Sequence, residues 1–182
     1  MIKITETPLN TLFDSNNEST KKNDALQILK EQSLAINKLK YPNLPDFARV
    51  CPKYEDKTSN GLTKCIIHFI QFNGGQAERI NCTGRAINKQ TTYQDVLGHC
   101  RTIGSIEYIK TTGTRGTADI SATIKGRSVK IEVKIGKDRQ SEAQKQYQVD
   151  IELSGGLYYI AKDFNSFYLW YLNTFKGDEN GK

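Results

Sequence analysis

The pattern of apolar and polar residues predicts two amphipathic helices in the first half of the chain. Apolar side chains recur at helical spacing in residues 23–39, and again from Ser59-Asn60 up to the glycine pair Gly74-Gly75, which ends the second helix. Residues 41–60 between them contain three prolines and are expected to form an irregular linker. Residues 1–20 are polar and rich in Asn, Thr and Ser, which predicts a loosely docked terminus.

The most regular alternation lies in residues 118–135 and predicts an antiparallel β-hairpin. Polar and apolar residues alternate on both sides of the turn sequence Lys125-Gly126-Arg127. A loop of two or four residues keeps apolar residues opposite each other, whereas an odd loop would turn one strand to the wrong face. The resulting register places Ile120 opposite Ile131, Ala122 opposite Val129, and Asp119 opposite Glu132.

After the hairpin, the sequence predicts a strand, helix, strand crossover. Ser141 and Gln144 form the S-x-x-Q pattern of a capping box, and the helix that it starts runs to about Leu153. The apolar residues 157–161 form the next strand, which a right-handed crossover places parallel to residues 128–135. A final helix begins at Asp163 or Ser166. Its large apolar side chains are expected in the core: Phe167, Tyr168, Trp170, Tyr171 and Leu172.

Ahead of the hairpin, residues 76–82 and 105–112 are predicted strands, and residues 83–98 a polar loop. The whole pattern is typical of an α/β fold, with a mixed β-sheet of about four to five strands flanked by helices. We expect an N-terminal helical extension in residues 1–57, a domain in residues 58–175, and a flexible tail in residues 176–182.

The composition favours one compact domain with an appendage, because the chain has 182 residues. No run of apolar residues approaches the roughly 18 of a membrane span, and the first residues lack the pattern of a secretory signal. We therefore expect neither membrane insertion nor secretion. The four cysteines are scattered without a C-x-x-C motif, which favours reduced thiols and a cytoplasmic protein.

The net charge of +6 is concentrated in the middle of the chain. Residues 61–150 carry 14 basic and 8 acidic side chains, which leaves +6, whereas residues 1–60 carry +1 and residues 151–182 carry −1. This surplus is consistent with a surface that faces nucleic acid, and equally with lysines on the solvated faces of strands and helices.

The hairpin register brings two carboxylates together. Asp119 and Glu132 would lie directly opposite each other, and like charges in that position repel. Lys134 lies on the face of Glu132, about 6.6 Å along the strand. A divalent cation, a nearby lysine such as Lys134 or Lys130, or solvation at a sheet edge could each offset the repulsion.

Taken together, these motifs resemble the PD-(D/E)xK nucleases, and within them the VRR-NUC branch, whose short members often occur in phages and mobile elements. The resemblance covers roughly residues 60–172 and implies a restriction-endonuclease-like core. The similar residues are Gly116-Thr117-Ala118-Asp119, Glu132-Val133-Lys134, the run GKDRQSEAQ at 136–144 and Gly155-Gly156, with Gly75, Arg79-Ile80-Asn81 and Gly84-Arg85 upstream.

The resemblance implies a metal site on the hairpin. Asp119 and Glu132 would bind Mg²⁺ or Mn²⁺, and the backbone carbonyl of Val133 would complete a ligand set of hard oxygens. Lys134 would position the attacking water or stabilise charge on the phosphate. Gln144 is similar to a glutamine that supports this site from the helix, although a Gln at this place in a capping box also has a local role.

The chain departs from the family pattern at three places. Ala118 stands where the family usually has proline, and Val129-Lys130-Ile131 keeps only one basic residue of the Val-Arg-Arg motif. Residues 61–73 contain no acidic residue, whereas the early helix of many members carries a glutamate aimed at the metals. The sequence therefore favours a one-metal mechanism.

The resemblance implies hydrolysis of phosphodiester bonds in DNA by an endo- or exonuclease, with junctions and flaps among the candidate substrates. Junction cleavage would need two sites and hence a homodimer. An alternative from another class is a non-catalytic nucleic-acid-binding module that retains the nuclease fold. The candidate phosphate contacts are Arg79, Arg85, Arg115, Arg127, Lys137 and Arg139.

Overall fold

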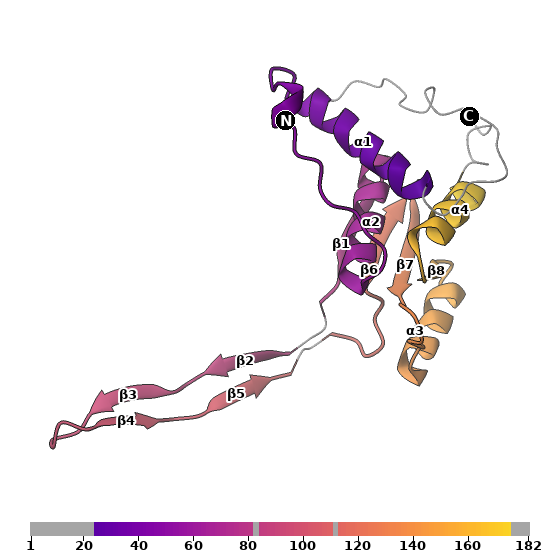
Figure 1. The fold of residues 1–182 in the computed structure, drawn as a ribbon. Coiled ribbons are helices and arrows are strands. Elements are labelled where there is room, and N and C mark those ends of the chain that lie inside the picture. Colours follow the sequence, from indigo (N-terminus) through magenta and orange to yellow (C-terminus); the bar gives the residue numbers. More distant parts are fainter. Residues whose placement is uncertain (1–23, 82–83, 111–112, 176–182) are drawn as a thin grey trace.

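The computed structural model describes residues 24–81, 84–110 and 113–175, which form a body of helices around a small sheet and a projecting arm (Figure 1). The terminus expected in residues 1–20 and the tail at 176–182 lie outside the described residues. The described helices agree closely with the helical patterns. They are α1 (Asp24–Lys40), α2 (Ser59–Phe72), α3 (Glu142–Leu153) and α4 (Phe164–Phe175), with a short 3-10 turn at Asp46–Ala48 in the linker.

The body contains a mixed four-stranded sheet in the order β1-β6-β7-β8, which confirms the α/β architecture. Its strands are β1 (Gln76–Arg79), β6 (Ile120–Ile124), β7 (Arg127–Val133) and β8 (Leu157–Ala161). The pairs β1–β6 and β6–β7 are antiparallel, and β7–β8 is parallel. The crossover through α3 is therefore confirmed, whereas β1 ends before the predicted limit at residue 82.

The predicted register of the central hairpin is confirmed. Ile120 pairs with Ile131 and Ala122 with Val129, and the ladder continues to Ile124 opposite Arg127. The loop is thus the two-residue alternative, Lys125-Gly126, with φ of 46° and 77°. Positive φ at both central positions is the backbone of a turn that matches the twist of a hairpin.

The helices cover the sheet on both faces. The Tyr159 ring of β8 stacks on Trp170 of α4 at 4.4 Å between centroids, whereas the neighbouring Tyr158 contacts Tyr147 of α3 at 6.4 Å. Successive residues of a strand point to opposite faces, so α4 and α3 lie on opposite sides of the sheet. Helix α2 belongs to the layer of α4, since Phe69 contacts four of its rings at 5.0 to 6.1 Å: Phe164, Phe167, Tyr168 and Tyr171.

The hydrophobic core lies between the sheet and the layer of α1, α2 and α4. Phe69, Phe167 and Leu29 are at most 2% exposed, and burying one such side chain stabilises the fold by roughly 1.5–3 kcal/mol. The aromatic face of α4 is therefore core, as the sequence predicts. Ala25 and Leu29 of α1 share this core, so the helix of the N-terminal extension docks on the body.

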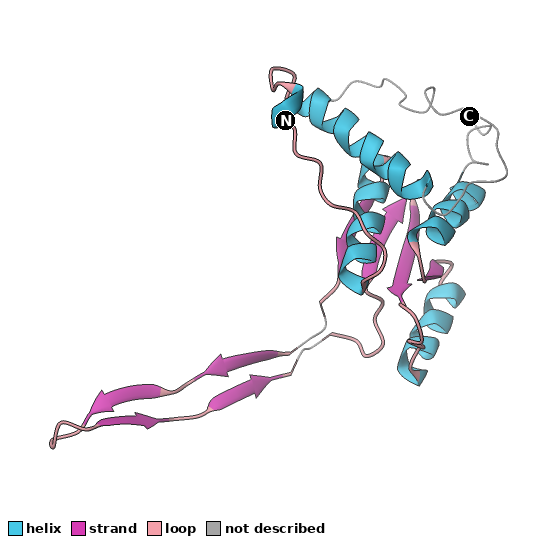
Figure 2. Ribbon diagram, in the orientation of Figure 1, coloured by secondary structure: helices cyan, strands magenta, loops and turns pink. Residues whose placement is uncertain are grey.

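The prediction of a polar loop in residues 83–98 is wrong for the residues of this range that the structure describes. Its residues form β2 (Arg85–Asn88) and β3 (Thr91–Gln94), which pair with β5 (Ile106–Ile109) and β4 (Cys100–Ile103) in a two-stranded arm (Figure 2). Every residue of β3, β4 and β5 is exposed. With neither face buried, no clear alternation of apolar and polar residues marks β3 and β4. The strand predicted at 105–112 is confirmed as β5, but it lies outside the main sheet.

None of the helices in the described ranges combines the length and the apolar character that a membrane span requires.

Candidate active site

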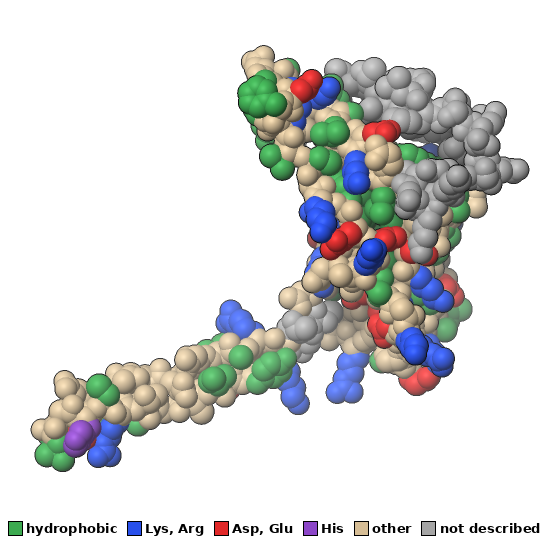
Figure 3. Space-filling view, viewed as in Figure 1, with side chains coloured by type: hydrophobic (Ala, Val, Ile, Leu, Met, Phe, Trp, Pro, Cys, Tyr) green, Lys and Arg blue, Asp and Glu red, His purple; other side chains and the backbone are tan. Residues whose placement is uncertain are grey.

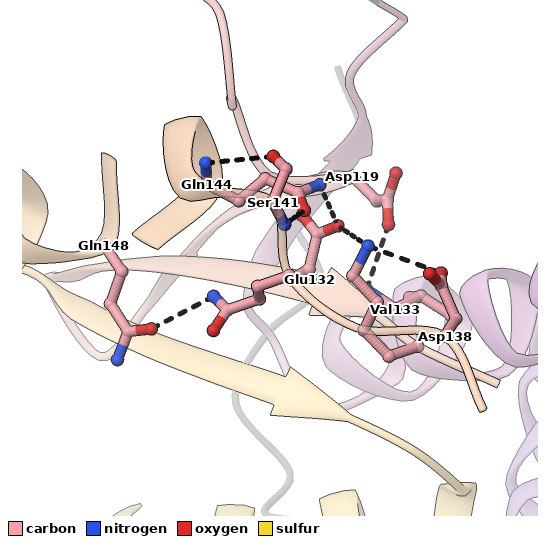
Figure 4. Close-up of polar contacts among 9 residues, drawn as sticks. Asp119, Glu132, Val133, Asp138, Ser141, Gln144 and Gln148 are labelled. Atoms are coloured by element: carbon pink, nitrogen blue, oxygen red, sulfur yellow. Dashed lines mark hydrogen bonds and ion pairs between the residues drawn. The ribbon is translucent and has the colours of Figure 1, made fainter. Parts of the chain in front are cut away.

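Glu132 is the centre of a polar cluster at the end of β7, and its side chain is almost completely buried. Its Oε1 accepts hydrogen bonds from Gln144 Nε2 at 2.5 Å and from Lys134 Nζ at 3.0 Å (Figure 4). Its Oε2 is buried and makes no hydrogen bond of standard geometry among the described residues, although the backbone N–H of Asp119 lies close enough to lower the pKa of the carboxyl in part. A buried carboxylate oxygen without a well-formed hydrogen bond is costly, so this atom marks a place where a cationic or hydrogen-donating ligand would be stabilising.

Asp119 lies just before β6, one position beyond the Ile120–Ile131 pair and thus opposite Glu132. Its Oδ2 accepts a hydrogen bond from the backbone N–H of Val133 at 2.9 Å. Its backbone carbonyl accepts from Ile80 N at 2.8 Å, which ties the start of the hairpin to the end of β1. The two carboxylates that the register predicts to face each other therefore lie at one end of the central strand pair, β6 and β7.

Lys134 offsets the charge of Glu132. Its ammonium lies 3.0 Å from Glu132 and 3.3 Å from Asp138, and the residue is 8% exposed. The sequence left a divalent cation, a nearby lysine and solvation as ways to offset the repulsion between the two acids. The structure shows the lysine, Lys134, beside Glu132. It excludes solvation for Glu132, which is 1% exposed. Asp138 is a partner that sequence reasoning missed, although it follows Lys134 by four residues in the predicted loop.

Gln144 makes both of the contacts that its two predicted roles require. Its amide oxygen accepts from Ser141 N at 2.9 Å and Ser141 Oγ accepts from Gln144 N, which completes the capping box of α3. Its amide nitrogen donates to Glu132. One side chain thus caps the helix and holds the carboxylate, and the geometry of the cap sets the direction of the second hydrogen bond.

The loop before Asp119 packs closely on the first turn of α3 because residue 116 is glycine. Gly116 has φ of +78°, and a Cβ there would lie 2.2 Å from the carbonyl oxygen of Ala143. Only glycine permits this approach. It brings the exposed Arg115 to the same side of the molecule as the start of α3.

Burial dominates the electrostatics of the cluster. It raises the pKa of Glu132, the hydrogen bond from Lys134 lowers it in part, and the negative charge of Asp119 raises it again. Burial alone would lower the pKa of Lys134, but its bonds to Glu132 and Asp138 outweigh burial and the pKa is raised. Lys134 is therefore an ammonium at neutral pH. Burial also raises the pKa of Tyr158 to about 12, with a smaller effect from Glu132.

Tyr158 is a second residue that sequence reasoning missed. It pairs with Lys130 across the parallel β7–β8 ladder, which places it on the face of Glu132. The sequence could have indicated Tyr158, because residues 157–161 were predicted as a strand parallel to β7, and alternate residues of such a strand lie on the same face as the acids.

Three of the six predicted phosphate contacts gather near the cluster. Arg115 lies in the loop that packs on α3, and Lys137 and Arg139 are exposed in the loop from β7 to α3. The other three lie elsewhere. Arg79 donates to Asn60 Oδ1 at 2.8 Å on the side of α2, and Arg85 lies at the base of the arm. Arg127 is over the Phe175 ring, at 5.9 Å, and about 17 Å along β7 from Glu132.

The donor set fits a hard divalent cation bound by few protein ligands. Within the described part of the chain, no group of three His, Cys, Asp or Glu side chains is placed to hold a metal. Two carboxylates with a main-chain oxygen and several waters are, however, an ordinary arrangement for Mg²⁺. The Oε2 of Glu132 opposite Asp119, which makes no hydrogen bond of standard geometry in the described chain, is consistent with that arrangement.

No family model matches the chain, and a search of curated proteins finds no significant relative.

Proposed function

We propose that the protein is a metal-dependent nuclease that hydrolyses phosphodiester bonds in DNA, with a restriction-endonuclease-like core of the VRR-NUC branch of PD-(D/E)xK nucleases. The observation that carries the proposal is the environment of Glu132. Its carboxylate is withdrawn from solvent, one oxygen is held by Lys134 and Gln144, and the other makes no hydrogen bond of standard geometry in the described chain. A purely structural ion pair has no need of a poorly satisfied oxygen opposite a second carboxylate.

Asp119, Glu132 and the carbonyl of Val133 would hold one Mg²⁺ or Mn²⁺. When bound, this ion supplies Lewis-acid charge and an acidified water for attack on phosphorus. Gln144 holds Glu132 in place, and Asp119 is fixed by its hydrogen bond to Val133 N.

Lys134 would stabilise negative charge on the phosphate rather than take up a proton. Its raised pKa keeps the ammonium charged at neutral pH, and a charged donor in a water-poor site is worth most where charge develops. The other role that the resemblance implies, positioning the attacking water, is equally open to a charged ammonium.

The exposed side chains of Arg115, Lys137 and Arg139 would contact the DNA backbone, because they flank the acidic cluster. Phosphate contacts of this kind position a duplex without reading its sequence. They therefore support a nucleic-acid backbone as the substrate. The choice of DNA follows from the resemblance, and the preferred structure, whether junction, flap or plain duplex, is left to experiment.

The proposal is tested by incubating the purified protein with labelled duplex, flapped, branched and single-stranded DNA in Mg²⁺ or Mn²⁺. We expect cleavage by the wild type, and a loss of at least about 100-fold in Asp119→Ala and Lys134→Ala. Glu142→Gln is the matched control, since Glu142 is an exposed carboxylate two residues before Gln144, and this variant should cleave like the wild type.

Two outcomes would contradict the proposal. Cleavage that persists in Asp119→Ala would show that the hairpin acids are not the site. Binding of DNA by the wild type without cleavage under any metal condition would instead support the non-catalytic binding module.

A further inference from the structure

Tyr158 of β8 lies beside the candidate site, on the face of the sheet that α3 covers. In the parallel ladder Tyr158 pairs with Lys130, and Glu132 pairs with Ile160. Tyr158 is therefore the diagonal neighbour of Glu132. Strands lie about 4.8 Å apart and two residues along a strand span about 6.6 Å, so the two Cα atoms are about 8 Å apart. An aromatic side chain can reach across that distance.

The hydroxyl of Tyr158 is buried and makes no hydrogen bond of standard geometry among the described residues. The side chain of Gln140 lies close enough to lower the pKa of this hydroxyl in part. The largest effects of charge on that pKa come from Glu132 and then from Asp119, and both raise it. The hydroxyl therefore lies within the field of the two acids.

The ring of Tyr158 is held between the sheet and α3 by a contact that needs no hydroxyl. Its centroid lies 6.4 Å from that of Tyr147 in an edge-to-face arrangement. None of the residues of α3 is buried, and charged side chains lie on the surface around this helix (Figure 3). A phenylalanine at position 158 would make the same ring contact.

Packing alone would therefore favour phenylalanine at this position. A buried hydroxyl without a well-formed hydrogen bond destabilises a fold, and replacing it by an apolar group of the same shape is neutral or stabilising. A phenol is a hydrogen-bond donor and a carboxylate an acceptor. A phenol that is costly to the fold and lies beside Glu132 thus points to a role at the site.

We propose that Tyr158 is a positioning residue of the candidate site, whose hydroxyl donates a hydrogen bond to the carboxylate of Glu132 and helps to hold it as a metal ligand. Lys134 and Gln144 already donate to the same carboxylate. Hydrogen bonds of this kind are often long or poorly aligned before a site is filled, and tighten when the ligand binds. The inference rests on the metal site of the proposed function, and not on the cleavage of DNA.

The hydroxyl acts as a donor and not as a base. Burial raises the pKa of Tyr158 to about 12, so the phenol keeps its proton at neutral pH. Its effect is then limited to the orientation of Glu132, and removing the hydroxyl should change the affinity for the metal more than the chemistry at phosphorus.

Mn²⁺ titration of the full chain by calorimetry tests the proposal. Tyr158→Phe should lower the affinity for Mn²⁺ about 10-fold, while the midpoint of urea denaturation stays the same or rises. Tyr159→Phe is the matched control. Tyr159 is the next residue and is also partly buried, but it lies on the opposite face against Trp170, so this variant should bind Mn²⁺ like the wild type.

A second variant separates Glu132 from the neighbouring loop. Gln140 donates to Gln148 of α3 at 3.1 Å, so Tyr158 could also act by holding this residue. If the hydroxyl acts on Glu132, Gln140→Ala should keep most of the affinity for Mn²⁺. A loss in Gln140→Ala equal to that in Tyr158→Phe would overturn the assignment, and so would a loss of affinity in Tyr158→Phe that is matched by a loss of stability.

DNA cleavage provides a further readout. Tyr158→Phe should cleave more slowly than the wild type at limiting Mn²⁺ and equally fast at saturating Mn²⁺. Equal Mn²⁺ affinity in the wild type and Tyr158→Phe would overturn the role of Tyr158 and leave the nuclease proposal intact. Mn²⁺ binding that depends on Tyr158 without any cleavage would support the role and contradict the nuclease. A wild type that binds no Mn²⁺ would overturn both.

Discussion

At the residue scale, Gln144 links the stability of α3 to the position of the candidate metal ligand. The same amide caps the helix through its oxygen and holds Glu132 through its nitrogen. Residues that orient a metal ligand typically contribute 10- to 100-fold to metal affinity or activity. A helix cap contributes about 1 kcal/mol to stability. The two effects should therefore be separable by substitution.

Gln144→Ala is expected to lose about 1 kcal/mol of stability and 10- to 100-fold in Mn²⁺ affinity and DNA cleavage. Ser141→Ala removes the cap alone and should show a similar loss of stability with nearly unchanged metal affinity. Urea denaturation and Mn²⁺ titration measure the two quantities. Equal losses of metal affinity in both variants would show that Gln144 acts only through the helix.

At the element scale, the close contact between the loop at residues 113–118 and α3 assembles the site from two separate segments. The contact depends on the missing side chain of Gly116, since its Cβ position is 2.2 Å from Ala143 O. Gly126 in the hairpin turn has nearly the same backbone conformation, with φ of +77°, but open space around it. Comparing alanine substitutions at Gly116 and Gly126 therefore separates the cost of a steric clash from the cost of backbone strain.

Gly126→Ala should cost about 1–2 kcal/mol, because an L residue at positive φ is strained. Gly116→Ala adds a clash with the backbone of α3 and should cost more than Gly126→Ala by at least about 1 kcal/mol. Urea denaturation of both variants tests the difference. Similar losses would mean that the loop moves freely away from α3.

At the scale of the whole molecule, the linker fastens the N-terminal extension to the body through α2 and α4. The Tyr54 hydroxyl and His68 Nδ1 of α2 are hydrogen bonded at 2.8 Å, and Asp56 accepts from Phe164 N at 3.3 Å. Burial lowers the pKa of His68, and the charge of Lys64 lowers it further. The fold therefore favours the neutral imidazole.

This shift predicts a loss of stability in mild acid. The folded state binds the His68 proton less readily than the unfolded state, so the contribution is complete above the ordinary value of 6.5. It is lost as the pH falls through the lower pKa of the folded state. His68→Gln should flatten this loss between about pH 8 and about pH 5, measured by chemical denaturation. A slope equal to that of the wild type would contradict the assignment.

Local pattern was sufficient for the elements of the body and for part of the site. Alternation and the turn at Lys125-Gly126 predict the register that sets Asp119 opposite Glu132, and the capping-box spacing predicts the start of α3. Of the four strands of the arm only β5 was predicted, because strands such as β3 and β4 bury neither face and so lack a clear alternation of apolar and polar residues. Arg127 is a predicted phosphate contact because of its charge, but it lies at the opposite end of β7 from Glu132, over the ring of Phe175.

The sequence by itself determined the helices, the hairpin register and the order of acids and lysine along β7, because these depend on contacts between residues close in the chain. Only the tertiary structure decided that Glu132 is buried, that Lys134 and Gln144 share one of its oxygens, and that the other makes no hydrogen bond of standard geometry in the described residues. Burial and pKa depend on which distant segments pack together, here β7, α3 and the loop at Gly116. That packing is also what makes one pair of facing acids a candidate active site.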